Sequence, residues 1–181
     1  MAVIDAAVVA VWAMLPAYLP NNAAVLAGGG PPIDGGRHWR GARLFGDGKT
    51  WRGLAAGTVT GMVVAVLLSG LAPMASELLG VGVPRFPLVA VVSLPLGAML
   101  GDITASFVKR RTGRQRGASL PLVDQLDLVA GALLLTFLAA PDWTLATFTV
   151  PVLVAVLVLT PVLHLVTNGI GYLLDLKEEP W

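Results

Sequence analysis

Long apolar segments separated by two clusters of basic residues constrain this sequence more than any other feature. Hydrophobic residues make up 56% of the 181 residues and charged residues only 13%, whereas a soluble domain carries about 25% charged residues. A helix needs about 20 apolar residues to cross the bilayer core. We therefore expect a single polytopic membrane domain over residues 1–181.

Five segments have the apolar character of transmembrane helices. They cover approximately residues 2–27, 54–71, 86–107, 122–139 and 143–174. The last is longer than one crossing needs and contains Pro151 and Pro161, so we expect it to tilt or kink. The predicted fold class is an all-α integral membrane protein with five transmembrane helices and two long loops, at about residues 28–53 and 108–121.

The two long loops contain ten of the twelve Lys and Arg residues, five in each loop. The positive-inside rule therefore predicts that both loops are cytoplasmic, with the N-terminus outside and the C-terminus inside. The expected location is the cell membrane, with several crossings and the functional face on the cytoplasmic side. A net charge of +1 gives no indication of nucleic-acid binding, and the absence of cysteine excludes disulfides and thiolate metal sites.

Three aspartates flank the second basic loop at the ends of apolar segments. Asp102, Ser106 and Lys109 are spaced i, i+4 and i+7, which places them on one helix face. Asp124 and Asp127 are spaced i, i+3 and also share a face. An ionisable residue in an apolar helix is costly and indicates a functional site. If the two helices pack together, the three carboxylates suit Mg²⁺, which prefers oxygen ligands and substrate phosphates.

The basic residues of this loop can hold the charge of a polyphosphate or a lipid phosphate. They include Arg110, Arg111, Arg114 and Arg116. The alternative is a loop that only sets the orientation of the chain and whose arginines pair with the nearby carboxylates.

Glycines are concentrated in the first loop, in the segments Gly28–Arg37 and Gly46–Gly53. Glycine lets the backbone approach an anion closely and present several N–H groups to it. Lys49 and Thr50 directly precede the second apolar segment, where a phosphate gains from the helix dipole and from the lysine. The spacing of the preceding glycine does not fit a Walker A loop. The alternative is a flexible basic loop that contacts anionic lipid head groups.

Together, these motifs resemble the CDP-archaeol synthase family. The matching segments are Tyr18–Asn21, Gly28–Asp34, Leu44–Gly53, Gly101–Arg111 and Pro121–Asp127. The distal half is also similar to the CDP-diacylglycerol synthases of bacteria and eukaryotes. This chain lacks their His-Gly-Gly between the Lys-Arg pair and the later aspartates, which favours the archaeal branch.

The resemblance implies a cytidylyltransferase of archaeal membrane lipid biosynthesis. The phosphate of 2,3-bis-O-geranylgeranylglycerol 1-phosphate would attack the α-phosphorus of CTP, releasing pyrophosphate and forming CDP-archaeol. Such a displacement requires alignment and charge neutralisation more than a covalent protein group. The implied partners are CTP, the ether-lipid phosphate and membrane lipids, without nucleic acid. The sequence does not indicate an oligomeric state.

The resemblance also implies roles for individual residues. The cofactor would be Mg²⁺, held by Asp102, Asp124 and Asp127. The catalytic set would add Ser106, Lys109 and Arg110. Contacts to CTP would come from Asn21, Asp34, Arg37, Asp47, Gly48, Lys49 and Thr50.

Two other classes of membrane protein are alternatives. A CDP-alcohol phosphotransferase also uses magnesium and CDP-lipids, but its Asp-Gly-x-x-Ala-Arg…Gly-x-x-x-Asp-x-x-x-Asp pattern is absent. A small transporter is expected to place charges near the midplane and to show repeat symmetry, neither of which the sequence displays. A structural scaffold would leave the clustered carboxylates and basic residues unexplained.

Overall fold

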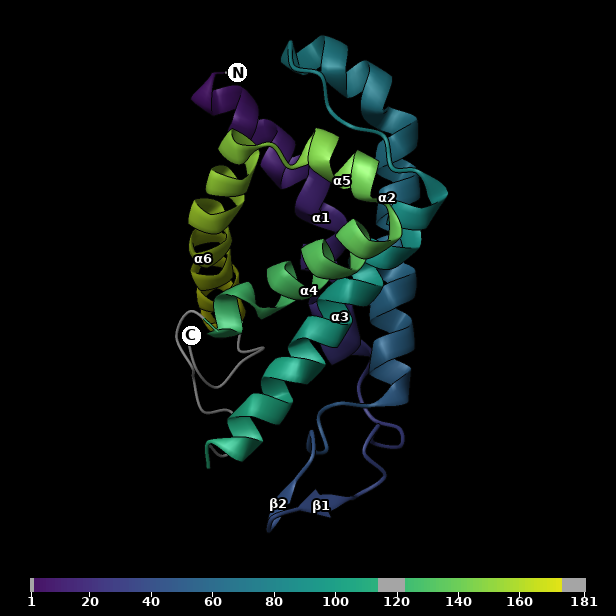
Figure 1. Cartoon of the computed structure of the whole chain (residues 1–181), viewed down its shortest axis with the longest axis vertical. Coiled ribbons are helices and arrows are strands. Elements are labelled where there is room, and N and C mark those ends of the chain that lie inside the picture. Colours follow the sequence, from purple (N-terminus) through teal and green to yellow (C-terminus); the bar gives the residue numbers. More distant parts are fainter. Residues whose placement is uncertain (1, 114–122, 174–181) are drawn as a thin grey trace.

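The fold, given by a computed structural model that describes residues 2–113 and 123–173, consists of helices and one small hairpin (Figure 1). In chain order the elements are α1 (Val3–Ala27), β1 (His38–Trp39), β2 (Ala42–Arg43), α2 (Trp51–Leu79), α3 (Leu88–Arg111), α4 (Val123–Ala139), α5 (Pro141–Thr147) and α6 (Val150–Leu173).

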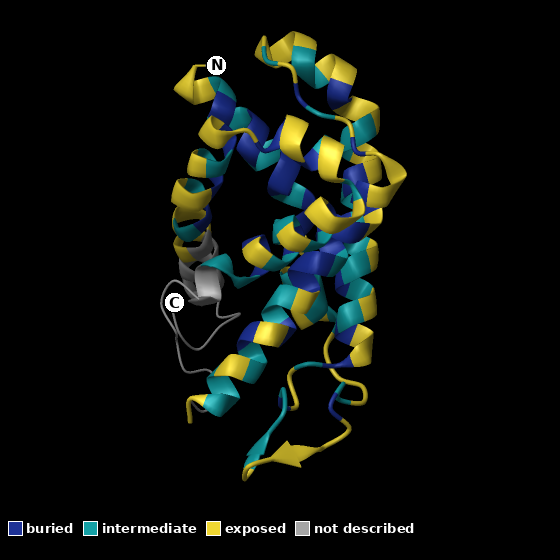
Figure 2. Cartoon of the chain, viewed as in Figure 1, coloured by how far each residue is buried: buried dark blue, intermediate teal, exposed yellow. Residues whose placement is uncertain are grey.

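The apolar helices confirm the predicted class of an all-helical membrane protein. In the described residues, α1, α2 and α3 are long and apolar enough to cross a bilayer, and α5 with α6 forms one further, bent candidate. The apolar part of α4, Leu126–Ala139, is shorter. Five large apolar side chains in the middle of α2 are 46% to 59% exposed, as expected for a face that contacts lipid: Val59, Val63, Val66, Leu67 and Leu71. Figure 2 colours the exposed residues of the chain yellow.

The segment expected as one helix over residues 143–174 is divided between α5 and α6, which meet at 77°. The amide of Phe148 still donates to the carbonyl of Thr144, at 2.8 Å, and closes the last turn of α5. Pro151 lies in the first turn of α6, where its missing N–H costs nothing. The proline therefore favours a new helix start at this point.

Glycines allow helices to pack with their backbones in contact. A Cβ atom at Gly57 of α2 would lie 2.7 Å from the carbonyl oxygen of Pro20 in α1. A Cβ at Gly101 of α3 would overlap the carbonyl oxygen of Asp127 in α4 and lie 2.9 Å from its carbonyl carbon. Small residues are the usual means of close helix packing in membranes. This crossing places the α4 backbone at Asp127 directly beside the residue that precedes Asp102.

The core lies between α1, α3, α4 and α6. Its largest fully buried apolar side chains are Met14, Leu94, Val152 and Val156. A buried hydrogen bond of 3.1 Å between the hydroxyls of Ser93 and Thr136 joins α3 to α4. Figure 1 shows the β1–β2 hairpin and the end of α3 at one end of the molecule, and the N-terminus and the end of α2 at the other. The described parts of both basic loops therefore lie at the same end.

Candidate functional site: a polar pocket between the first loop and α3

A pocket of about 350 Å³, its open mouth included, lies where α1, α2 and α3 meet the first loop. Its polar side chains come from residues far apart in the sequence, Asn21, Lys49, Thr50 and Asp102. Apolar side chains complete the wall, among them Ile33, Leu54, Met99 and Ile103. The pocket therefore combines a charged end with an apolar side.

An ion pair crosses this pocket. The Nζ atom of Lys49 lies 2.5 Å from Oδ2 of Asp102. The two side chains are 22% and 16% exposed, so the pair is largely shielded from water. Burial of a carboxylate requires such a partner. The pair brings together one residue that the sequence assigns to nucleotide binding and one that it assigns to metal binding.

The turn that carries Lys49 is built by the backbone. Gly46 has a φ of 91°, which only glycine adopts without strain, and its carbonyl accepts from the Lys49 amide at 3.2 Å. Thr50 is the N-cap of α2, and its hydroxyl accepts from the Gly53 amide at 3.1 Å. The Lys49 carbonyl accepts from Ile33 at 2.8 Å. The glycine-rich segment and the start of α2 are thus held together.

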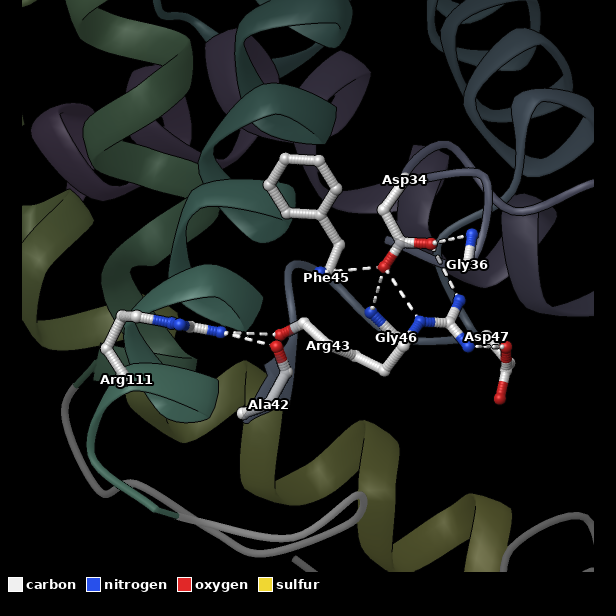
Figure 3. A network of polar contacts seen from close by, with 8 residues as sticks. All are labelled: Asp34, Gly36, Ala42, Arg43, Phe45, Gly46, Asp47 and Arg111. Carbon is white, nitrogen blue, oxygen red and sulfur yellow. Dashed lines mark hydrogen bonds and ion pairs between the residues drawn. The ribbon is translucent and has the colours of Figure 1, made fainter. Parts of the chain in front are cut away.

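Asp34 organises the interior of the first loop (Figure 3). Its buried carboxylate accepts hydrogen bonds from Nε and Nη2 of Arg43, at 3.2 and 2.6 Å. The amides of Phe45 and Gly46 donate to it at 3.0 Å each, and that of Gly36 at 3.1 Å. The hydrogen bonds from Arg43, reinforced by these amides, hold the pKa of Asp34 well below its ordinary value.

Arg43 has a role that the sequence motifs did not reveal. Its Nη1 atom also lies 2.6 Å from Oδ1 of Asp47, so one guanidinium joins two aspartates. These contacts, that to Asp34 first, raise the pKa of Arg43 further above its ordinary value. Asp34 precedes Arg43 by nine positions, which matches no helix or strand period. The only sequence feature that could have indicated these contacts is the number of arginines in the loop.

The predicted residues fall into two groups. The pocket wall includes five of them, Asn21, Gly48, Lys49, Thr50 and Asp102. The others with described side chains lie outside that wall: Asp34, Arg37, Asp47, Ser106, Lys109, Arg110 and Asp127.

Two of the outer residues nevertheless lie close to parts of the site. A Cβ at Gly46 would lie 3.4 Å from Nε of Arg110, so the end of α3 contacts the first loop. Oδ1 of Asp127 accepts from the Leu128 amide at 2.5 Å. Arg110 therefore lies beside the first loop, and the backbone of Asp127 lies beside Gly101 of α3.

The structure describes the side chains of two of the three expected metal ligands, Asp102 and Asp127. The side chain of Asp124 lies outside the described residues. Among the residues that the structure describes, no group of three acidic or histidine side chains is arranged to hold a metal ion. Asp102 and Asp127 supply oxygen donors on the two helices that cross at Gly101, a donor type that suits a hard divalent cation.

The fold and pocket define a helical membrane protein with a charged pocket where α1, α2 and α3 meet the first loop. The family model for CarS-like proteins, CDP-archaeol synthase, matches residues 3–181. The chain therefore belongs to the CDP-archaeol synthase family.

Similar proteins and a solved structure agree with this family. The CDP-archaeol synthase of Halobacterium salinarum is 64% identical over 181 residues, covering 100% of both chains. That of Methanosarcina acetivorans is 50% identical, covering 93% of this chain and 100% of the relative. A solved structure of "an intramembrane enzyme for archaeal membrane lipids biosynthesis" superposes with a TM-score of 0.67 and 37% identity, covering 88% of this chain and 92% of that chain.

Proposed function

We propose that this protein is a CTP-dependent nucleotidyltransferase that forms CDP-archaeol and pyrophosphate from CTP and 2,3-bis-O-geranylgeranylglycerol 1-phosphate. The observation that carries the proposal is the Lys49–Asp102 pair in the pocket, together with family membership over residues 3–181. Membership also argues against the phosphotransferase and transporter alternatives. The protein works in the membrane, and its substrates are a nucleotide and a lipid.

CTP enters from the first loop. Its phosphates lie against the start of α2, where backbone N–H groups and the helix dipole favour an anion. Lys49 neutralises phosphate charge, with Gly48 and Thr50 beside it, and Asn21 reaches the base or ribose. Asp34 and Asp47 act through Arg43, because their carboxylates hold the loop in shape. Arg37, exposed in the same loop, closes over the nucleotide.

The cation would be Mg²⁺, and Asp102 of α3 with Asp124 and Asp127 of α4 would hold it. When bound, it offsets negative charge on the α- and β-phosphates. Lys49 turns from Asp102 to the phosphates as CTP binds, and the Asp102 carboxylate becomes available as an oxygen ligand. Lys49 and Asp102 are largely shielded from water, so each charge needs a partner. The phosphates would become the partner of Lys49, and the cation would become the partner of Asp102.

The reaction is a direct displacement. A phosphate oxygen of the lipid forms a bond to the α-phosphorus of CTP, and the bond between that phosphorus and the bridging oxygen breaks to release pyrophosphate. The lipid phosphate is already an oxyanion at neutral pH, so no general base is needed. Lys109 and Arg110 neutralise the incoming and leaving phosphates, and Ser106 on the same helix is a polar neighbour.

The membrane arrangement follows the charge distribution. The chain crosses the bilayer five times, with the N-terminus outside and both basic loops in the cytoplasm. The site then lies at the cytoplasmic face, where CTP is present and the lipid phosphate reaches it from the inner leaflet. The lipid chains lie in a groove between the spans.

The test is a defined assay with purified protein, CTP, Mg²⁺ and the geranylgeranyl ether phosphate. We expect CDP-lipid and pyrophosphate in equal amounts. Asp102→Asn should lower the rate at least about 100-fold and leave the protein folded. Asp142→Asn is a matched control, because Asp142 is an exposed aspartate in α5 that does not line the pocket. Absence of product with the wild type, or full activity of Asp102→Asn, would contradict the proposal.

A further inference from the structure

Arg111, the last residue of α3, binds the backbone of the hairpin (Figure 3). Its Nη2 atom donates to the carbonyls of Ala42 and Arg43, at 3.1 and 2.7 Å. Its Nη1 atom donates to the carbonyl of Trp39. One side chain therefore satisfies three carbonyls around the β1–β2 turn.

Aromatic rings complete the same contact. The rings of Trp39 and Phe107 stack with centroids 5.9 Å apart and planes inclined by 13°. The Arg111 guanidinium carbon lies 5.2 Å from the Trp39 centroid and 5.3 Å from that of Phe107. Cation–π contacts of this kind add to the hydrogen bonds. The hairpin is thus fixed to the last turns of α3 by both polar and apolar contacts.

The hairpin connects to the pocket through the first loop. The side chain of Arg43, whose carbonyl Arg111 binds, holds Asp34. Asp34 in turn accepts from the Gly46 amide, and the Gly46 carbonyl accepts from Lys49. An unbroken series of hydrogen bonds therefore runs from the end of α3 to the residue that pairs with Asp102.

We infer that Arg111 is a positioning residue, which fixes the first loop on α3 so that Lys49 faces Asp102, and does not itself bind phosphate. The inference rests on the proposed function and assigns Arg111 differently from the phosphate-binding role that its sequence position suggests. Both of its terminal nitrogens point to backbone carbonyls. Lysine is a poor substitute, because its single ammonium cannot span several acceptors as the planar guanidinium does.

The first test separates positioning from overall folding by kinetics. In Arg111→Ala and Arg111→Lys, we expect the KM for CTP to rise about tenfold or more, because the loop is no longer preorganised. The KM for the lipid phosphate should change less than about threefold. Arg40→Asn is the matched control, since Arg40 also lies over Trp39 but is exposed, and Asn tolerates its positive φ. Equal changes in both KM values would overturn the inference.

The second test replaces the arginine by a covalent tether. The chain has no cysteine, so Arg111→Cys combined with Ala42→Cys offers one defined pair for a short bismaleimide. Before cross-linking, we expect the raised KM for CTP; after cross-linking, the KM should return to within about threefold of wild type. If Arg111 binds phosphate directly, the tether restores nothing, and that result would overturn the inference.

A third measurement does not depend on catalysis. A single Ala42→Cys substitution reports the accessibility of the hairpin through its rate of maleimide labelling. We expect faster labelling when Arg111→Ala is added and no change when Arg40→Asn is added. Unchanged labelling in Arg111→Ala would refute the anchoring, whereas faster labelling in a protein that makes no CDP-lipid would refute only the proposed function.

Discussion

The Nζ atom of Lys49 lies 2.5 Å from Oδ2 of Asp102, a residue 53 positions further along the chain. One member comes from the glycine-rich loop and the other from an apolar helix. In this pair the ammonium compensates the carboxylate before any ligand arrives. We propose that nucleotide binding exchanges partners, with Lys49 turning to phosphate and Asp102 to the cation.

Exchanging the two charges tests whether the pair has more than a structural role. Lys49→Asp and Asp102→Lys should each lower stability, because each leaves two like charges in a partly buried site. The double variant should regain most of the thermal stability, since an ion pair is restored. Its rate should remain at least about 100-fold below wild type, because the phosphate and cation ligands are in the wrong places. Recovery of both properties in the CDP-lipid assay would mean that the pair is only structural.

Removal of divalent cations should stop the reaction. We expect EDTA to abolish CDP-lipid formation and excess Mg²⁺ to restore it, because the phosphates and acidic ligands repel each other without a cation. Mg²⁺ with CTP should also raise the melting temperature by ligand linkage. That increase should be lost in Asp102→Asn and kept in Asp142→Asn. Undiminished activity in EDTA would exclude the metal assignment.

The close crossing of α3 and α4 predicts a large effect at Gly101. A Cβ there would lie 2.9 Å from the Asp127 carbonyl carbon, so Gly101→Ala must separate the two helices. We expect a loss of about 1–3 kcal/mol in stability and a larger relative loss of activity, because Asp127 moves away from Asp102. Gly70→Ala in α2 is the control, since nothing lies within 4 Å of that position. Thermal unfolding in detergent and the CDP-lipid assay measure both, and equal behaviour of the two variants would contradict the packing argument.

The Asp34–Arg43 pair predicts a pH dependence of loop stability. Arg43 keeps the pKa of Asp34 below its ordinary value, so the folded loop binds fewer protons than the unfolded chain at low pH. Its stabilisation is therefore fully present above about pH 4, the ordinary pKa of aspartate, and is lost as the pH falls toward the lower folded-state pKa.

Proteolysis of the loop between pH 7 and pH 3 measures this dependence. Asp34→Asn should be less stable than wild type at pH 7, and the difference should shrink below about pH 4. Asp47→Asn should have a smaller effect, because the Asp47 side chain is 68% exposed. A constant difference over the whole pH range would argue against an ionised Asp34.

The proposed orientation predicts which loops an impermeant reagent reaches in intact cells. Single cysteines at positions 82 and 42 report the two ends of the molecule. A side chain is tolerated at Gly82, because this residue is exposed and no atom lies within 4 Å of the position that a Cβ would take there. We expect a membrane-impermeant maleimide to label position 82 in intact cells and position 42 only after permeabilisation. The opposite pattern would invert the topology.

Much of the helical plan was predictable from apolar length alone. The segments expected at 2–27, 86–107 and 122–139 correspond to α1, α3 and α4 within a few residues. The segment expected at 54–71 is only the central part of α2, which extends over Trp51–Leu79. A search for apolar segments misses the polar and small residues at the ends of helices. The first and last residues of a helix are therefore the least predictable feature. The count of five crossings stays a prediction.

The sequence by itself determined the membrane class, the family and the residue types of the site, because length, hydropathy and local motifs are properties of contiguous segments. Only the tertiary structure decided which charges meet. The Lys49–Asp102 pair, the Arg43–Asp34 pair and the Arg111 contacts to the hairpin all join residues without regular spacing. Their proximity depends on glycines that let helix backbones touch and on a loop that folds around one buried carboxylate, and such contacts arise from packing in three dimensions.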